Sequence, residues 1–279
     1  MIYIGKHLSI KDGIAKTIQK SIDNDLYTTQ IFIGNPQGTA LSKITEKEKT
    51  NIISIIKDNN FRLIIHSKYI LNFSKEFGIN EWHLKTFIEE LELSNSINAE
   101  CLVIHMGKSV KLGLDEAKSN FINSIKYFCK YIKENNLNVK IGLETAASQG
   151  TELFGNKKDF CDMFNLFTIE EKKCLNCIVD TAHIFSSGEN LNNNIDEYLK
   201  YISKNIGKKY IGAFHLNGSK VECGAKKDRH SDLKTGFINY DVLLKVAEFG
   251  VTNNIPIILE TPSDSLNEAK DLVKYFSSK

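Results

Sequence analysis

Eight short apolar runs follow one another along the chain, with polar segments between them. They occupy residues 2–8, 29–34, 61–66, 100–106, 139–144, 176–181, 210–216 and 255–260. Most of these runs are continuously apolar rather than alternating, which is typical of strands that are buried on both faces of a parallel sheet. We therefore predict eight parallel strands.

The segments between the runs are amphipathic and predict helices. Ile14, Ile18 and Ile22 recur every four residues within 12–25, so they lie on one helical face. Thr45 and Glu48 have the spacing of a capping box at the start of 45–59. Further helices are expected at 79–95, 114–135, 157–171, 193–205, 239–250 and 264–277.

The alternation of strand and helix, repeated eight times, predicts a (β/α)8 TIM barrel of the α/β class. No linker, low-complexity tract or change of composition divides the chain. We expect a single barrel domain over residues 1–279, because α/β barrels of about 250 residues commonly form one domain. Its active site should lie at the C-terminal ends of the strands.

Side chains that bind metals follow the apolar runs. Five of the seven histidines and four carboxylates have this placement, and they are His66, His105, Glu144, Asp180, His183, His215, Asp228, His230 and Glu260. Carboxylates that meet at one mouth of a barrel repel one another; divalent cations remove this repulsion, and neutral imidazoles add ligands without charge. The set therefore predicts several divalent metal ions at one mouth, and with them metal-assisted hydrolysis.

The other histidines and the cysteines are expected to have different roles. His83 lies within a predicted helix and should pack in the core, whereas His7 ends the first run and could support a metal ligand. Cys174 and Cys177 form a lone Cys-x-x-Cys pair without a second pair, so we interpret them as packing residues. The scattered cysteines indicate free thiols and a reducing compartment.

Composition narrows the class of protein. A hydrophobic fraction of 42% supports a large core, and a net charge of +2 does not by itself indicate a protein that binds nucleic acid. The sequence contains no signal-peptide pattern and no apolar run long enough to cross a membrane. We expect an intracellular protein that does not bind membranes and is not secreted through a signal peptide.

Seven motifs spread over nearly the whole chain carry a family resemblance: IGKHLS, HSKYILN, ETAASQG, DTAH, FHLNGSK, DRH and ILET. With them the chain resembles the endonuclease IV family, the zinc-dependent apurinic/apyrimidinic endonucleases. The resemblance implies three Zn²⁺ per chain, with Mn²⁺ as an alternative at one site of mixed nitrogen and oxygen ligands. The implied ligands are His66 and His105 for the first ion, Glu144 as a bridge to the second, Asp180, His215 and Glu260 for the second, and His183, Asp228 and His230 for the third.

The resemblance also implies a reaction in base excision repair. The enzyme would hydrolyse the phosphodiester 5′ to an abasic site in double-stranded DNA and leave a 3′-hydroxyl and a 5′-deoxyribose phosphate. Trimming of blocked 3′ ends is an additional activity of the family. Glu144 would be the catalytic residue. We expect the protein to act as a monomer.

The loops after the second and third runs are implied to contact DNA. Tyr69 matches the tyrosine that the family inserts at the lesion, and Ile70 replaces the usual leucine. Gln37 stands where arginine is usual, which removes a charge. Arg229 could extend a positive rim, together with Lys68, Lys108, Lys220, Lys226 and Lys227. Three further departures leave every ligand in place: Met106 for proline, Thr145 for asparagine and Ala182 for cysteine.

Two other functions remain open from the sequence. A sugar isomerase or epimerase of similar ancestry needs only about four strand-end ligands, akin to Glu144, Asp180, His215 and Glu260. It would leave the other five ligand candidates without a role. A non-catalytic barrel that binds damaged DNA or stores metal has no evident need for all nine. The complete ligand set therefore favours the nuclease.

Overall fold

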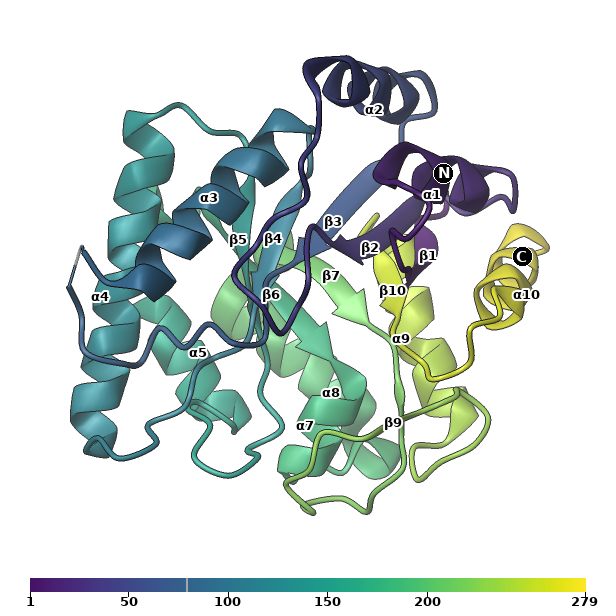
Figure 1. The fold of residues 1–279 in the computed structure, drawn as a ribbon. Coiled ribbons are helices and arrows are strands. Elements are labelled where there is room, and N and C mark those ends of the chain that lie inside the picture. Colours follow the sequence, from purple (N-terminus) through teal and green to yellow (C-terminus); the bar gives the residue numbers. More distant parts are fainter. Residues whose placement is uncertain (79) are drawn as a thin grey trace.

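The computed structural model describes residues 1–78 and 80–279 and forms a closed barrel of eight parallel strands (Figure 1). The strands are β1 (Ile4–His7), β2 (Thr28–Phe32), β3 (Arg62–His66), β4 (Cys101–Ile104), β5 (Lys140–Glu144), β6 (Leu175–Asp180), β7 (Ile211–His215) and β10 (Ile257–Leu259). Each strand pairs with the next one along the ring, and β10 closes on β1 with Ile257 opposite Ile4. The predicted TIM barrel is confirmed.

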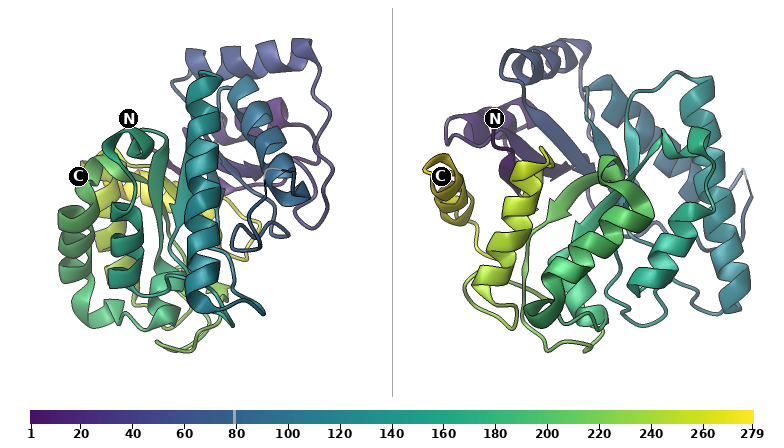
Figure 2. Two further views of the ribbon diagram at one scale, coloured as in Figure 1. Left: turned by 90° about the vertical axis from the view of Figure 1, so that its left-hand side faces the viewer. Right: turned by 180° about the vertical axis from the view of Figure 1, so that it is seen from behind.

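Helices surround the strands (Figure 2). They are α1 (Ile14–Ile22), α2 (Glu46–Asp58), α3 (Trp82–Ser96), α4 (Leu114–Glu134), α5 (Lys157–Asn165), α6 (Ile169–Lys172), α7 (Thr181–Ser187), α8 (Leu191–Ile202), α9 (Tyr240–Thr252) and α10 (Asn267–Ser277). A π-helical turn (Ser203–Gly207) and a 3-10 turn (Lys208–Tyr210) follow α8. The predicted capping box is present in α2, because Thr45 Oγ1 accepts from Glu48 N and the Glu48 side chain accepts from Thr45 N.

The helical pattern differs from the prediction in three places. The helix expected at 79–95 begins at Trp82, and residue 79 lies outside the described residues. The helix expected at 157–171 is divided into α5 and α6, because Thr168 starts a second capping box with Glu171. The sequence pattern does not predict α7, which begins directly after β6 because Asp180 caps it by accepting a hydrogen bond from His183 N at 2.8 Å.

The interior of the barrel contains a small apolar layer, separate from the larger core between strands and helices. Its members are Ile64, Cys101, Val103, Ile178, Ala213 and Ile258. In β5 the matching position is Gly142, where an added Cβ would lie 2.8 Å from the Cys101 sulfur, so the crowded layer admits no side chain there. Packing of this layer fixes which face of each strand points inward.

Strand periodicity then determines where the candidate ligands point. Side chains two residues apart lie on the same face of a strand. Six candidates stand two residues after an interior position, at or just beyond the C-terminal ends of their strands, and they are His66, His105, Glu144, Asp180, His215 and Glu260. They therefore form the next layer toward the mouth of the barrel.

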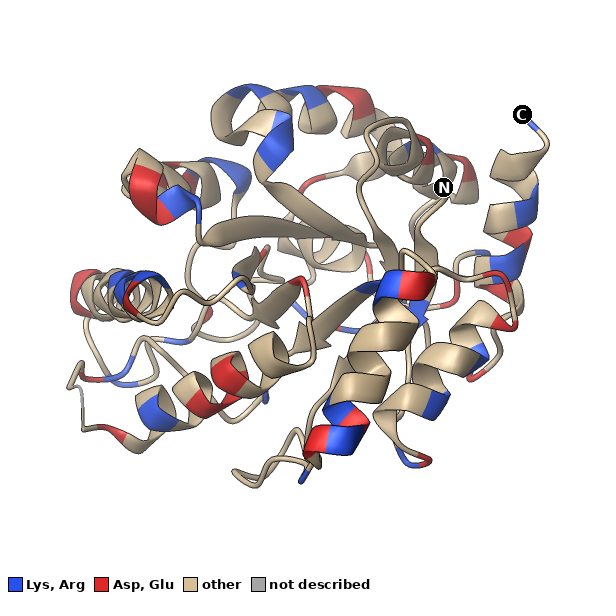
Figure 3. Ribbon diagram, turned by 90° about the horizontal axis from the view of Figure 1, so that it is seen from above, with Lys and Arg blue, Asp and Glu red and all other residues tan. Residues whose placement is uncertain are grey.

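Charged residues lie mainly on the outer helices and loops, with both signs interspersed along the helices seen in Figure 3. The strands in this view carry few of them. No described helix combines the length and the apolar character that a bilayer span requires.

Candidate metal centre

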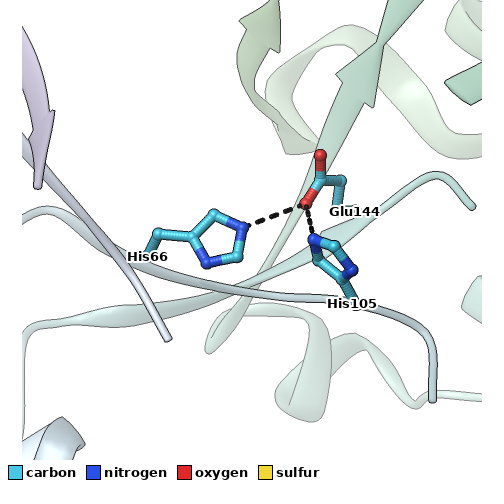
Figure 4. Close-up of side chains that lie close together, drawn as sticks. All are labelled: His66, His105 and Glu144. Carbon is cyan, nitrogen blue, oxygen red and sulfur yellow. Dashed lines mark ion pairs between the residues drawn. The ribbon is translucent and has the colours of Figure 1, made fainter. Parts of the chain in front are cut away.

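The first group of ligand candidates joins β3, β4 and β5. His66 Nε2 lies 3.4 Å from Glu144 Oε2, and His105 Nε2 lies 3.3 Å from the same oxygen (Figure 4). Both imidazoles thus converge on one carboxylate oxygen. These three side chains have the spacing of ligands that could share one metal ion.

The second group lies around the other oxygen of Glu144. His215 Nδ1 is 2.8 Å from Glu144 Oε1 and 3.2 Å from Glu260 Oε2, and it is 3.9 Å from Asp180 Oδ2. Glu144, Asp180, His215 and Glu260 could hold a second ion. The two oxygens of Glu144 therefore face different groups, which is the arrangement that a bridging carboxylate requires.

The third group combines Asp180, at the end of β6, with residues that lie beyond the barrel strands. His183 Nε2 and His230 Nε2 approach Asp228 Oδ1 at 3.3 and 3.1 Å, and His230 Nε2 is 3.6 Å from Asp180 Oδ2. Asp180, His183 and His230 have the spacing of ligands to one ion. All nine residues predicted from the sequence thus lie at one mouth of the barrel.

His183, Asp228 and His230 are positioned by short elements beyond the barrel strands. His183 lies in the first turn of α7, which Asp180 caps. His230 lies on a two-stranded hairpin, β8 (Gly218–Ser219) with β9 (His230–Ser231), that the sequence pattern does not predict. Gln149 Oε1 accepts a hydrogen bond from Asp228 N at 3.0 Å and so positions the loop before β9.

Hydrogen bonds fix the tautomers of three histidines. Since a carbonyl oxygen can only accept, His66 Nδ1 donates to Ser67 O at 2.7 Å and His183 Nδ1 donates to Thr145 O at 2.8 Å. His215 Nε2 likewise donates to Gln30 Oε1 at 2.9 Å. When the ring is neutral, the other nitrogen carries the lone pair and faces the carboxylates, as a metal ligand does.

The electrostatics of the group are those of buried, strongly interacting charges. Burial alone would lower the pKa of His183 and His215, but neighbouring carboxylates raise both well above the ordinary histidine value. Burial would raise the pKa of Glu144, yet His215 and His105 hold it well below its usual range. Burial raises the pKa of Asp180, which has two other carboxylates nearby. Without a cation, the carboxylates are therefore balanced only by protons on the histidines.

Three polar atoms at this mouth support a fit to metal ions. Glu144 Oε2, His183 Nε2 and His230 Nε2 are buried, and although oppositely charged groups lie 3.1 to 3.4 Å away, no described residue makes a well-oriented hydrogen bond to them. A buried polar atom without a partner is costly, and all three point into the ligand groups. Their nitrogen and carboxylate character suits Zn²⁺.

Sequence reasoning missed the amides that hold the ligands. The Gln30 side chain donates to Glu260 Oε1 at 2.6 Å while accepting from His215. Asn217 donates to Asp180 Oδ2 at 2.7 Å and accepts from Glu260 N. A signal was available: Gln30 is a fully buried polar residue at the centre of strand β2. However, amide side chains are not typical zinc ligands, so a search of the sequence for metal ligands passes over them.

The histidines outside the nine divide as expected. His7 Nδ1 lies 2.9 Å from the Gln30 amide nitrogen and 3.4 Å from Glu260 Oε1, so it contacts the surroundings of a ligand. His83 lies in α3, buried beside Phe73, and belongs to no ligand group among the described residues.

The residues expected to contact DNA lie around the mouth. Tyr69 is 55% exposed, and its ring centroid is 5.3 Å from that of His66 and 5.6 Å from that of His105. Gln37 and Arg229 are exposed, and Ile70 is half-buried. A cavity of about 370 Å³ reaches from Tyr69 past His105 to Asp228.

One lysine of the expected positive rim has a different role. Lys68 is buried, and its ammonium donates to Asn35 O at 3.0 Å and Ala40 O at 2.8 Å. Tyr69 N also donates to Pro36 O at 3.0 Å. Lys68 therefore ties the loop that carries Gln37 to the loop that carries Tyr69, and its charge does not face solvent.

Comparison with known proteins places the chain in a family. A family model described as a xylose isomerase-like TIM barrel matches residues 23–278. The chain is 32% identical over 265 residues to a Pediococcus pentosaceus protein named "Probable endonuclease 4", covering 93% of this chain and 87% of the relative. It is 31% identical over 274 residues to a Ureaplasma parvum protein of the same name, covering 96% and 89%.

A solved structure gives the same answer for the fold. The crystal structure of endonuclease IV from Thermus thermophilus superposes with a TM-score of 0.82 at 20% identity, over 99% of this chain and 98% of that one. The chain belongs to the endonuclease IV family of xylose isomerase-like TIM barrels.

Proposed function

We propose that the protein is a zinc-dependent endonuclease of base excision repair. It hydrolyses the phosphodiester 5′ to an abasic site in duplex DNA, leaving a 3′-hydroxyl and a 5′-deoxyribose phosphate, and it also trims blocked 3′ ends. The observation that carries the proposal is the convergence of nine ligand-type side chains into three overlapping groups at one mouth of the barrel. The names of the relatives support it.

Three Zn²⁺ ions account for the ligand geometry. His66 and His105 would hold one ion with Glu144, whose second oxygen would reach the ion held by Asp180, His215 and Glu260. His183, Asp228 and His230 would hold the third. Asp180 Oδ2 lies 3.6 Å from His230 Nε2 and 3.9 Å from His215 Nδ1, so this carboxylate stands between the second and third groups.

Charge explains why the site needs its ions to bind DNA. Four carboxylates contribute −4 and three Zn²⁺ contribute +6, so the loaded mouth carries about +2 and attracts phosphate. Without ions the same carboxylates repel a phosphodiester. Zinc supplies Lewis acidity and a hydroxide nucleophile near neutral pH.

The side chains of this chain would bind and orient the substrate. Tyr69 presents an exposed ring beside His66 and His105, where it can fill the gap left by a missing base. Ile70 would add an apolar contact, and Gln37 and Arg229 would approach the DNA backbone. Gln30 and Asn217 would hold the carboxylates and His215 in place through their hydrogen bonds.

The matching family model is described as xylose isomerase-like, so a sugar isomerase or epimerase is the alternative function. Such a site would use the group of Glu144, Asp180, His215 and Glu260. It would leave the buried nitrogens of His183 and His230 without a metal and with no well-oriented hydrogen bond, although Asp228 Oδ1 lies 3.3 and 3.1 Å away. The cost of burying unused polar atoms argues for the nuclease.

Incision of a duplex that contains one tetrahydrofuran residue tests the proposal. The purified protein should carry about three zinc ions and should nick the duplex on the 5′ side of the analogue. Chelation should remove the activity, and added Zn²⁺ should restore it. Stoichiometric zinc without incision would contradict the proposed function, and isomerisation of a ketose would support the alternative.

Glu144→Gln should abolish incision while leaving the fold intact. The amide keeps the shape of the side chain but loses the charge that lies between two ligand groups. We expect a loss of roughly a thousandfold or more in rate, measured on the same duplex with circular dichroism as the check on folding. Glu116→Gln, on the exposed face of α4, is the matched control. Wild-type turnover by Glu144→Gln would refute the bridging role.

A further inference from the structure

A buried carboxyl group lies behind the first group of ligand candidates. Glu90 is on the buried face of α3, together with Phe87 and Leu91, and it is 1% exposed. Among the described residues it belongs to none of the three ligand groups. Burying a carboxyl group costs stability, and positions that break the rules of core packing in this way are most often functional. Glu90 is therefore a candidate for a role at the site.

Glu90 reaches the first metal ligand through one residue. Ser67 Oγ donates to Glu90 Oε2 at 2.5 Å, and Ser67 O accepts from His66 Nδ1 at 2.7 Å. Both hydrogen bonds are shielded from water, since Ser67 and His66 are each 2% exposed. The direction of the His66 ring therefore depends on the direction of the Ser67 carbonyl group.

Ser67 is the first residue beyond β3, where strand pairing no longer fixes its orientation fully. β3 ends at His66, which lies opposite Val103 of β4. Ser67 N still donates to Val103 O at 2.8 Å, and Glu90 is the hydrogen-bond partner of the Ser67 hydroxyl. With its N–H held by β4 and its hydroxyl held by α3, Ser67 keeps its carbonyl directed at the His66 ring.

The third group of ligands has a similar construction, with one difference. Thr145 follows β5, and its carbonyl oxygen accepts from His183 Nδ1 at 2.8 Å. Its hydroxyl oxygen accepts from the main-chain N–H of Asp180 at 3.0 Å. The Thr145 hydroxyl is thus held by the main chain, which every side chain at position 180 provides. The Ser67 hydroxyl is held by a side chain, so its support depends on the residue at position 90.

We propose that Glu90 is a positioning residue of the first metal site and that it orients His66 through Ser67. As a result, His66 Nε2 is directed at Glu144 Oε2, which lies 3.4 Å away. A group that holds a metal-ligating histidine in this way typically contributes about ten- to a hundredfold in metal affinity. The inference rests on the proposed zinc centre, and it concerns how tightly an ion is held rather than the reaction.

Zinc binding by variants of Glu90 and Ser67 tests the proposal. Glu90→Leu fills similar space without an acceptor, and Ser67→Ala removes the donor. Each should weaken one zinc site by about tenfold or more, measured by competition with a chelator of known affinity. Because both changes break the same hydrogen bond, the double variant should lose no more than either single variant, and additive losses would refute a shared path. Glu90→Gln keeps an oxygen that accepts from Ser67 and should restore most of the affinity.

The metal-free protein provides a second readout by nuclear magnetic resonance. The His66 Nδ1 proton, assigned by its loss in His66→Gln, should exchange slowly with water in the wild type and in Glu90→Gln. It should exchange faster in Ser67→Ala and Glu90→Leu, because the Ser67 carbonyl is then less firmly held.

Two matched controls lie on the same helix. Glu89→Leu changes an exposed neighbour, and Ser94→Ala changes another buried serine, so both should behave as wild type in the two measurements. If either zinc affinity or proton exchange is unchanged in Ser67→Ala, the proposal is wrong, even where Glu90→Leu fails to fold. Neither readout requires DNA cleavage, so a protein that binds zinc without incision would contradict the proposed function and leave this inference standing.

Discussion

At the scale of single residues, uncharged amides do much of the positioning that the ligands need. Gln30 contacts His215 and Glu260 at once, and Thr145 accepts from Asp180 N while its carbonyl accepts from His183. Thr145 stands where the family resemblance led us to expect asparagine, and it contacts two ligand candidates, Asp180 and His183. The ligand types could be predicted because charged and imidazole groups are rare at buried strand ends. Their supports could not, because a buried amide is recognised only by what it contacts.

Gln30→Leu should weaken zinc binding by about tenfold or more, the usual effect of losing a group that orients a metal ligand. Leucine fills similar space but leaves His215 Nε2 and Glu260 Oε1 without their partner. Competition with a chelator of known affinity measures the change. Gln19→Leu, an exposed residue of α1, is the matched control. Unchanged affinity in Gln30→Leu would show that the hydrogen bonds do not orient the ligands.

Glu90 gives a prediction about pH. Its carboxyl is buried and accepts from Ser67 Oγ at 2.5 Å, and burial raises its pKa to about 7 from 4.5. The folded state therefore favours the protonated carboxyl. This contribution to stability is full below about pH 4.5 and is lost as the pH rises to about 7.

Glu90→Gln should remove this dependence and raise the free energy of unfolding at pH 8 relative to wild type. Denaturant unfolding at several pH values, with chelator present, measures it. The neighbouring Glu89 is exposed, so Glu89→Gln should keep the wild-type profile. A Glu90→Gln profile parallel to wild type would mean that Glu90 is ionised in the folded protein across this range.

At the scale of secondary structure, two short elements complete the site. Asp180 ends β6 and caps α7, so one side chain is both a ligand candidate and the start of the helix that carries His183. The β8–β9 hairpin carries His230. Long elements could be predicted from their periodicity. α7 and this hairpin could not be predicted in this way. α7 depends on the cap that Asp180 provides, and the hairpin has only two residues in each strand, so neither shows an extended pattern.

Gly218→Ala should disturb the hairpin and with it the third group of ligands. A Cβ at this position would lie 2.4 Å from Ser231 Oγ and 2.5 Å from Asp232 O, so β9 must move. We expect zinc content to fall from about three toward two per chain with the barrel still folded, measured by elemental analysis and circular dichroism. Gly113→Ala, where nothing lies within 4 Å, is the control. Full zinc content in Gly218→Ala would contradict a fixed hairpin.

At the scale of the whole molecule, one interior layer sets the direction of the ligands. Gly142 and Ile178 are interior neighbours, and Glu144 and Asp180 follow two residues later on the same faces. The barrel and its layer of ligands could thus be predicted together, from the lengths of the apolar runs and from the residues that end them. The roles of loop residues depend on tertiary contacts that the sequence does not show. Lys68 was expected in a positive rim, but it is buried and donates hydrogen bonds to main-chain oxygens of the loop after β2.

Gln37→Arg should make DNA binding tighter and more dependent on salt. The side chain is exposed on the β2–α2 loop beside the mouth, and the proposal places it near the DNA backbone. One added phosphate contact should steepen the slope of log K against log salt by about one. Binding to abasic duplex at several salt concentrations measures the slope. Asn123→Arg, an exposed position on α4, adds the same charge elsewhere, and an equal change in both variants would place Gln37 away from the DNA.

The hydrogen bonds of Lys68 have a consequence for how this family diversifies. The ammonium holds main-chain oxygens of Asn35 and Ala40, and these are the same whatever side chains the loop carries. If this loop contacts DNA as proposed, substitutions in 35–40 can therefore alter what it recognises without altering its position. An exchange such as glutamine for arginine at position 37 changes the chemistry offered to a substrate in a single mutational step. A lineage that keeps the lysine can thus vary its substrate preference while the scaffold stays constant.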